Sequence, residues 1–143
     1  MRVVFDTVGF VRGLINPQSR WGRILFDHSG TYQLVVSPAI VLEALDVLRR
    51  PEVVRLFSTL PGRDPARIVS ILQNAEAVEP MQTPEISRDP KEDKFLAAAL
   101  AAGADYLVTE DRDLLDLGTY EGTAIVNATA FIVLVEGEPA SLD

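Results

Sequence analysis

Residues 89–109 read DPKEDKFLAAALAAGADYLVT, and this stretch is the clearest guide to the fold. Asp89 can cap a helix, and Glu92 stands three residues later, as a capping box requires, with a proline at the first helical position between them. The predicted helix ends at Gly103, a residue type that favours helix C-termini. A short apolar run follows, so residues 105–109 are predicted to form a strand. The stretch therefore predicts a helix that leads directly into a buried strand.

The same alternation of helices and short apolar strands extends to both sides of this stretch. The other predicted strands lie at residues 3–5, 34–36, 77–79 and 124–126. The other predicted helices lie at residues 21–29, 38–50, 52–59, 65–75, 111–115 and 128–135. Strands separated by helices favour a parallel sheet that is covered on both faces. The predicted fold class is therefore α/β, and one domain is expected over residues 1–143 because no repeat or long linker interrupts the pattern.

The composition excludes several kinds of chemistry. The chain of 143 residues has no cysteine and one histidine, His28, which excludes thiolate catalysis and leaves little room for Ser-His-Asp or multi-histidine metal sites. Thirteen basic residues against 21 acidic ones give a formal net charge of −8. Bulk electrostatic attraction therefore does not bring nucleic acid to this protein. If the substrate is a phosphodiester, a divalent metal is the expected source of positive charge.

The N-terminus reads as the start of a strand rather than as a targeting segment. Met1 and Arg2 lead straight into VVFD, with no apolar stretch before the first charge. The longest mostly apolar runs, at 95–104 and 123–135, are shorter than the roughly 20 residues that a membrane-spanning helix needs. A cytoplasmic protein is therefore expected.

Four carboxylates stand where a parallel α/β sheet places its ligand site. Asp6 directly follows the first strand, and Asp111 follows the strand at 105–109 by two residues. Asp93 and Glu43 each lie early in a predicted helix. Strand C-termini and the following helix N-termini share one edge of such a sheet, so these side chains are expected to meet in one cleft. Because crowded carboxylates repel one another, a hard divalent cation such as Mg²⁺ or Mn²⁺ is the expected ligand.

Several of the acidic residues also have a structural interpretation. Helix capping accounts for Glu92, and Asp93 can favour the positive end of a helix dipole. Glu43 has the spacing to share a solvated helix face with Asp46 and Arg50. The sequence alone leaves these interpretations open beside the functional one.

The acidic residues that follow strands differ in how easily structure explains them. Turn formation or helix capping accounts for Asp111 and Asp113. Asp6 is harder to explain, because it follows an apolar strand and the first basic residue after it is Arg12. A carboxylate at a buried strand end needs a partner, so a functional role is favoured for Asp6.

Four segments together resemble the PIN domain family. They are VVFDT at 3–7, SPAI at 37–40 with Glu43 after it, RDPKEDKFL at 88–96 and ADYLVTEDRDLL at 104–115. The last two are specific to the family, and the four cover nearly the whole chain in the family's order. The resemblance is to PIN proteins of bacteria and archaea that are classed as toxins of toxin–antitoxin pairs. One position departs from the pattern, because Val8 stands where such proteins usually carry an asparagine.

The resemblance implies a three-layer α/β/α fold on a parallel sheet, a Mg²⁺- or Mn²⁺-dependent ribonuclease, a homodimer and an antitoxin partner. Carried over by position, the metal-site carboxylates are Asp6, Glu43, Asp93 and Asp111, with Asp113 as an accessory. Glu43 is either a ligand or the base that orients a water molecule. The candidates for contact with the RNA backbone are Arg12, Arg88 and Arg112.

Two other functions compete with this interpretation. The first is a catalytically weak PIN-like module that binds or regulates, which the loss of the usual amide at Val8 favours. The second is an aspartyl phosphatase of the haloacid dehalogenase type, in which Asp6 after the first strand would be the nucleophile. That chemistry wants a second aspartate two residues later, where this chain has Val8, so the phosphatase ranks low.

Overall fold

The computed structural model describes residues 1–59, 65–81 and 90–137. Within them the strands form a six-stranded sheet in the order β3-β2-β1-β4-β6-β5. Its strands are β1 (Arg2–Phe5), β2 (Gln33–Val36), β3 (Glu76–Ala77), β4 (Tyr106–Val108), β5 (Thr119–Tyr120) and β6 (Thr123–Val126). All neighbours pair in parallel except β5 and β6, which pair antiparallel. The predicted parallel sheet is therefore confirmed in its body, and β5 is an antiparallel addition at its edge.

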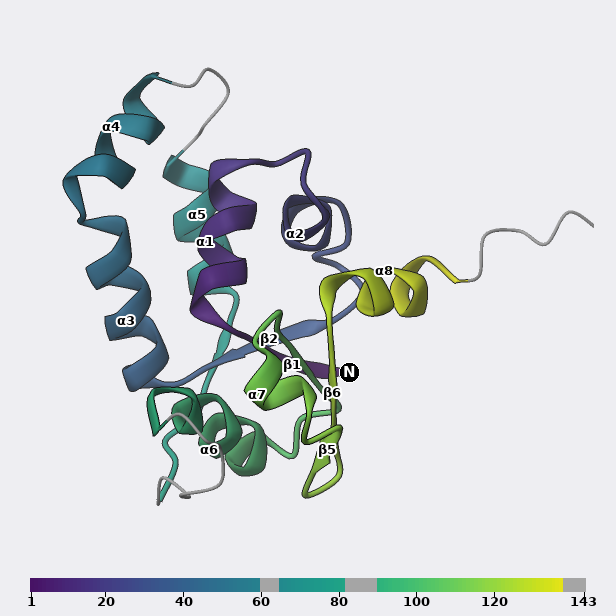
Figure 1. Ribbon diagram of the computed structural model, residues 1–143. Helices are drawn as coiled ribbons and strands as arrows, with labels where there is room; N and C mark the ends of the chain where they lie inside the picture. Colours follow the sequence, from purple (N-terminus) through teal and green to yellow (C-terminus); the bar gives the residue numbers. More distant parts are fainter. Residues whose placement is uncertain (60–64, 82–89, 138–143) are drawn as a thin grey trace, which may run out of the picture.

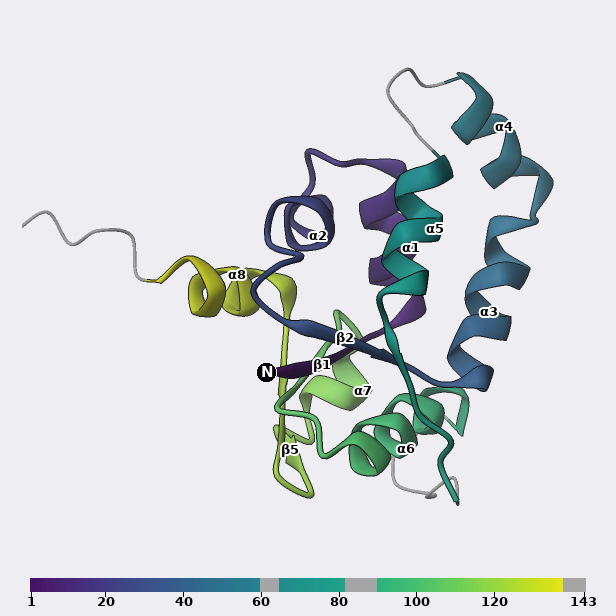
Figure 2. The ribbon, with the colours of Figure 1, turned by 180° about the vertical axis from the view of Figure 1, so that it is seen from behind.

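Helices cover both faces of this sheet. They are α1 (Thr7–Ile15), α2 (Arg20–Gly22), the π-helix η1 (Arg23–Asp27), α3 (Pro38–Leu48), α4 (Pro51–Thr59), α5 (Pro65–Gln73), the 3₁₀ turn η2 (Pro90–Glu92), α6 (Asp93–Ala102), α7 (Arg112–Leu115) and α8 (Ala128–Glu136). Figures 1 and 2 show α1, α2 and α8 on one side of the strands and α6 on the other. The predicted α/β class with three layers is confirmed. Over the described ranges, no helix combines the length and the apolar character needed to cross a membrane.

The strand side chains alternate between two hydrophobic cores. Val3 and Phe5 pack into the core under α1, α2 and α8, where Trp21 and Phe131 are also buried. Val4 packs into the opposite core, under α6 and α7. Every one of these strand residues is buried, which is the pattern of a parallel sheet with both faces covered. The same apolar runs that predicted strands therefore build both cores.

Local signals placed several helix ends correctly. Ser37 caps α3 by accepting a hydrogen bond at its Oγ from the N–H of Ile40, and Pro38 takes the first helical position. Gly103 ends α6 with φ of 58°, a left-handed conformation that costs glycine little. Asp89, the predicted cap of α6, lies outside the described residues. At the start of α6 the structure places Glu92 in the N-cap position, where its side chain makes no capping hydrogen bond.

Helix α1 was not predicted, and its packing explains why. Its sequence, TVGFVRGLI, is rich in glycine and β-branched residues, which are weak helix formers. The helix packs so closely against α2 that a Cβ atom at Gly9 would lie 2.2 Å from Cζ2 of Trp21. Gly13 meets Leu25 and the Trp21 backbone in the same way. Tertiary packing, rather than local propensity, therefore selects this helix and these glycines.

Candidate functional site

A cleft of about 200 Å³ opens at the C-terminal edge of the parallel strands. Its lining residues are Asp6, Thr7, Val8, Glu43, Glu92, Glu110 and Asp111. Five of the seven are acidic, and they come from the ends of β1 and β4, from the residue before α6 and from the middle of α3. The structure thus brings Asp6, Glu43 and Asp111 together, although they are widely separated in the sequence.

Asp6 is held by neutral hydrogen-bond donors. It caps α1, accepting at Oδ1 from the N–H of Gly9 at 2.7 Å. Its Oδ2 accepts from the Thr109 hydroxyl and from the N–H of Glu110, the latter at 3.2 Å. Burial raises the pKa of Asp6, whereas these hydrogen bonds lower it and the charge of Glu110 raises it further, with a net shift upward. The site therefore fixes the position of this carboxylate without neutralising its charge.

Thr109 connects Asp6 to Asp111. Its fully buried hydroxyl donates to Asp6 and accepts from the backbone N–H of Asp111 at 2.9 Å. Asp111 in turn caps α7, accepting at Oδ1 from the N–H groups of Asp113 at 2.8 Å and Leu114 at 3.2 Å. Sequence reasoning missed Thr109, and the signal that could have found it is a hydroxyl at the end of a buried strand, two residues before an aspartate.

Glu43 faces α6 rather than a solvated helix stripe. Its Oε2 lies 2.5 Å from Nζ of Lys94, whose side chain is 20% exposed. Asp46 of the same helix pairs loosely, at 3.9 Å, with Arg50, which lies just after the helix ends. Glu43 therefore does not share a solvated helix face with Asp46 and Arg50, and its side chain lines the cleft instead.

Glu92 is an acidic residue of the cleft that the sequence assigned to capping. Burial raises its pKa to about 7, and the charges of Asp111, Asp6 and Glu43 add to this, opposed by Lys94. Its position before α6 places it at the cleft wall. Because the capping box needs Asp89, which lies outside the described residues, that expectation stays a prediction. What the structure does show is a half-buried carboxylate among other carboxylates.

Among the described residues, the other predicted site residues are not part of the cleft lining. Asp93 is the first residue of α6 and is 3% exposed, but it is not among the cleft-lining residues. Asp113 lies in the first turn of α7, and its N–H binds Asp111. Arg12 on α1 and Arg112 on α7 are exposed, and Arg88 lies outside the described residues.

Glu110 was not predicted and ties the cleft to α8. Its Oε1 accepts from the N–H of Ala128, the first residue of α8, at 3.0 Å. The N-terminus of α8 carries partial positive charge, so it favours a carboxylate at this position whether or not the cleft binds a ligand. Glu110 therefore has a role in the fold besides lining the cleft.

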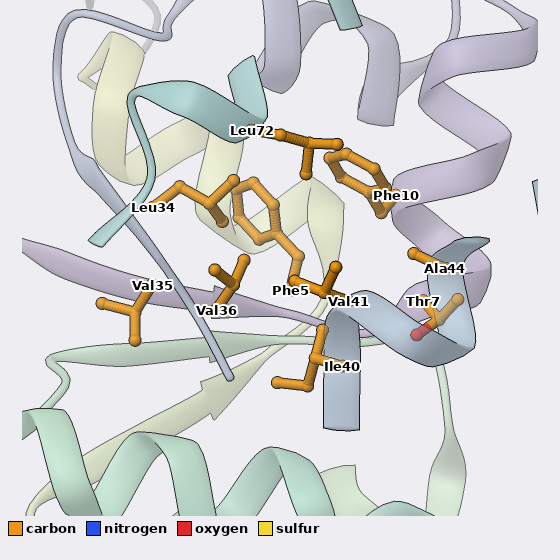
Figure 3. Close-up of a pocket in the computed structure, with 10 residues that line it drawn as sticks. All are labelled: Phe5, Thr7, Phe10, Leu34, Val35, Val36, Ile40, Val41, Ala44 and Leu72. Atoms are coloured by element: carbon orange, nitrogen blue, oxygen red, sulfur yellow. The ribbon is translucent and has the colours of Figure 1, made fainter. Parts of the chain in front are cut away.

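A second hollow is apolar and lies beside this one. It is lined by Phe5, Thr7, Phe10, Leu34, Val35, Val36, Ile40, Val41, Ala44 and Leu72 (Figure 3). Thr7 contributes to both hollows and supplies the sole side-chain oxygen among the lining residues of the apolar one. The apolar hollow therefore has no carboxylate among its lining residues.

The donor set of the cleft suits a hard divalent cation, because all its charged groups are carboxylates. Burial is the main cause of the raised pKa of Glu92, and repulsion from neighbouring carboxylates adds to it; a divalent cation would relieve that repulsion. Within the part of the chain that the structure describes, no three acidic or histidine side chains are gathered as a ready metal-binding group. The carboxylates of the cleft are thus suitable ligands for a divalent cation, but their side chains would have to turn toward the ion to bind it.

Comparison with known proteins agrees with this fold. The family profile described as PIN domain matches residues 2–113, from β1 into the start of α7. The chain belongs to the PIN domain family. A search of curated proteins finds no match. The family membership confirms the resemblance carried by the four sequence segments.

Two solved structures show the same PIN architecture. The crystal structure of VapBC2 from Rickettsia felis, bound to a DNA fragment from their promoter, matches with a TM-score of 0.58 and 11% identity, over 89% of this chain and 98% of that chain. PAE2754 from Pyrobaculum aerophilum matches with a TM-score of 0.58 and 17% identity, over 96% of this chain and 91% of that one. At these identities the likeness concerns the fold.

Proposed function

We propose that this PIN protein is a metal-dependent endoribonuclease and the toxin of a toxin–antitoxin pair. The observation that carries the proposal is the convergence of Asp6, Glu43 and Asp111 in one cleft at the ligand-binding edge of the sheet. Family membership supports a nuclease, since PIN domains are generally nucleases. An acidic cleft on an acidic protein fits phosphodiester chemistry when a cation mediates the contact.

The residues proposed to hold Mg²⁺ or Mn²⁺ are Asp6, Glu43, Asp93 and Asp111, with Asp113 as an accessory. A divalent ion bound there would activate a water molecule and neutralise charge on the scissile phosphate. The hydrogen bonds through Thr109 hold Asp6 and Asp111 in a fixed relation, so these two are the preorganised part of the site. Glu43 lies in α3, whereas Asp6 and Asp111 cap α1 and α7. From this separate position, Glu43 is suited to orient the attacking water.

We also propose how RNA and protein partners are recognised. The exposed Arg12 and Arg112, with Arg88, would contact RNA phosphates as local positive groups. The likeness to VapBC2 supports an antitoxin partner for this chain, and the chain would act as a homodimer in the cytoplasm. A basic segment of the antitoxin would be attracted to the acidic cleft.

The proposal is tested by RNA cleavage with Mn²⁺, with Mg²⁺ and with excess EDTA. The wild-type chain should give an RNA cleavage ladder that EDTA abolishes, and Asp6→Asn should give none. Asp46→Asn is a matched control, because it makes the same change at an exposed position of α3 outside the cleft. An inactive wild-type chain that still binds RNA or an antitoxin would instead support the catalytically weak module, and phosphate release from a monoester would support the phosphatase.

A further inference from the structure

A lysine outside the cleft lining is paired with one of the cleft carboxylates. Lys94, in the first turn of α6, reaches Glu43 with 2.5 Å between Nζ and Oε2. Within the described residues, Lys94 is the cation that forms an ion pair with a carboxylate lining the cleft. Its charge also reaches Glu92, whose pKa it lowers against the effect of burial.

Lys94 is positioned by more than Glu43. Its ammonium also donates to the backbone carbonyl of Lys91 and lies 5.1 Å from the centre of the Phe95 ring. The carbonyl oxygen and the ring face are both electron-rich, so they favour the Lys94 ammonium in this position even when Glu43 does not contact it. The lysine therefore has a defined position at the cleft rather than a loose surface pairing.

The other carboxylates are held by different groups. Asp6 and Asp111 accept hydrogen bonds from backbone N–H groups and a hydroxyl, none of which carries charge. Glu43 is thus the cleft carboxylate whose charge is directly compensated. The ammonium at 2.5 Å takes up one acceptor site of Oε2 and places a positive charge beside the carboxylate, so it competes with a metal ion for Glu43.

We propose that Lys94 is a built-in counter-ion that holds Glu43 in the metal-free protein, so that a divalent ion in the cleft competes with Lys94 for Glu43. This inference rests on the proposed function, since it assumes that the cleft binds a divalent metal. It makes Lys94 a positioning residue that lowers metal affinity. It also accounts for the absence, among the described residues, of a preassembled metal-binding group in a cleft with the right ligands.

Measurement of Mn²⁺ affinity separates this role from a structural one. Lys94→Met keeps the length of the side chain but removes its charge and offers no oxygen ligand. It should bind Mn²⁺ about tenfold more tightly by electron paramagnetic resonance titration, because a positive charge about 5 Å from a divalent ion repels it by roughly that factor in a water-like medium. Lys94→Arg should restore the weaker affinity. Arg50→Met removes one charge from an exposed position just after α3, outside the cleft lining, and should leave the affinity unchanged.

A second measurement needs no substitution. The chain has two lysines, Lys91 and Lys94, so lysine labelled with ¹³C at Cε gives two side-chain signals in NMR. Added Mg²⁺ should shift the Lys94 signal along the same saturation curve as metal binding, while the exposed Lys91 serves as an internal control.

The outcomes are distinguishable. Metal binding by the wild type with no gain for Lys94→Met and no shift of Lys94 would overturn the counter-ion role and leave the nuclease intact. A complete absence of Mn²⁺ binding in all variants would overturn both this inference and the proposed function. Weaker binding by Lys94→Met would show that the lysine merely organises the site, which contradicts the inference.

Discussion

The hydroxyl of Thr109 donates to Oδ2 of Asp6 across 103 residues of sequence, and the same oxygen accepts the backbone N–H of Asp111. One buried oxygen therefore links the Asp6 carboxylate after β1 to the backbone of Asp111 after β4. This arrangement makes Thr109 the residue through which the fold shapes the site.

Thr109→Val should damage both stability and the site. Valine keeps the shape of threonine but removes one of the two donors to Asp6 Oδ2 and the acceptor of the Asp111 N–H, which costs about 1–3 kcal/mol of unfolding free energy. Urea denaturation measures this loss, and Thr109→Ser, which keeps the hydroxyl, should lose less. Equal stability of the valine variant and the wild type would show that the hydrogen bonds contribute nothing.

The close contact between α1 and α2 predicts that Gly9 cannot be replaced. Gly9→Ala would place a Cβ atom 2.2 Å from the Trp21 ring, so either the helix or the ring has to move. Overpacking of this kind costs about 1–3 kcal/mol, and the Asp6 cap on the Gly9 N–H would shift with it. Gly30→Ala is the matched control, because no atom lies within 4 Å of the added methyl. Equal melting temperatures for Gly9→Ala and Gly30→Ala would contradict this close packing.

Stability of the metal-free protein should fall as pH rises toward neutrality. The pKa of Glu92 is raised by burial, and by Asp111 and Asp6, from 4.5 to about 7. The folded protein thus holds this proton more tightly than the unfolded chain. The resulting stabilisation is complete below about pH 4.5 and is lost as pH rises through about 7.

Glu92→Gln isolates this effect. After discounting for solvent exposure, the pH-dependent difference between wild type and variant is about 1–2 kcal/mol. Denaturation in EDTA at about pH 5 and pH 8 should show wild type losing more stability than Glu92→Gln over that interval. Parallel pH profiles for the two proteins would place Glu92 outside the carboxylate cluster.

Val8 provides a test of activity that leaves the fold unchanged. It lines the cleft, and its side chain is 66% exposed, so Val8→Asn should change stability by no more than about 0.5 kcal/mol. The new amide can donate a hydrogen bond to a phosphate at the cleft mouth, and metal-dependent RNA cleavage should become faster. Val8→Thr, which keeps the branched shape, should change the rate less. An unchanged rate for Val8→Asn would show that the residue does not limit turnover.

Sequence reasoning succeeded where local chemistry decides the structure. The Ser37 cap, the proline after it and the left-handed Gly103 depend on neighbouring residues alone, and all three are found. The buried strands were also predictable, because a parallel sheet covered on both faces gives continuous apolar runs.

The features that sequence reasoning missed depend on distant contacts. Helix α1 exists because Trp21 packs on its glycines, and β5 pairs with β6 through a turn with positive φ at Glu121 and Gly122, which lacks the usual Asn-Gly signal. At the site, the start of α6 decides which acidic side chain faces the cleft. A 3₁₀ turn directly before α6 determines the direction in which these side chains point, and the amino-acid sequence does not predict that turn.

The most direct test is anomalous scattering from crystals of the protein soaked with Mn²⁺. The account predicts a manganese peak in the cleft, within coordination distance of carboxylate oxygens of Asp6 and Asp111, with Glu43 turned away from Lys94 toward the ion. A fully soaked crystal with no peak in the cleft, or with manganese bound at a different part of the molecule, would contradict the account.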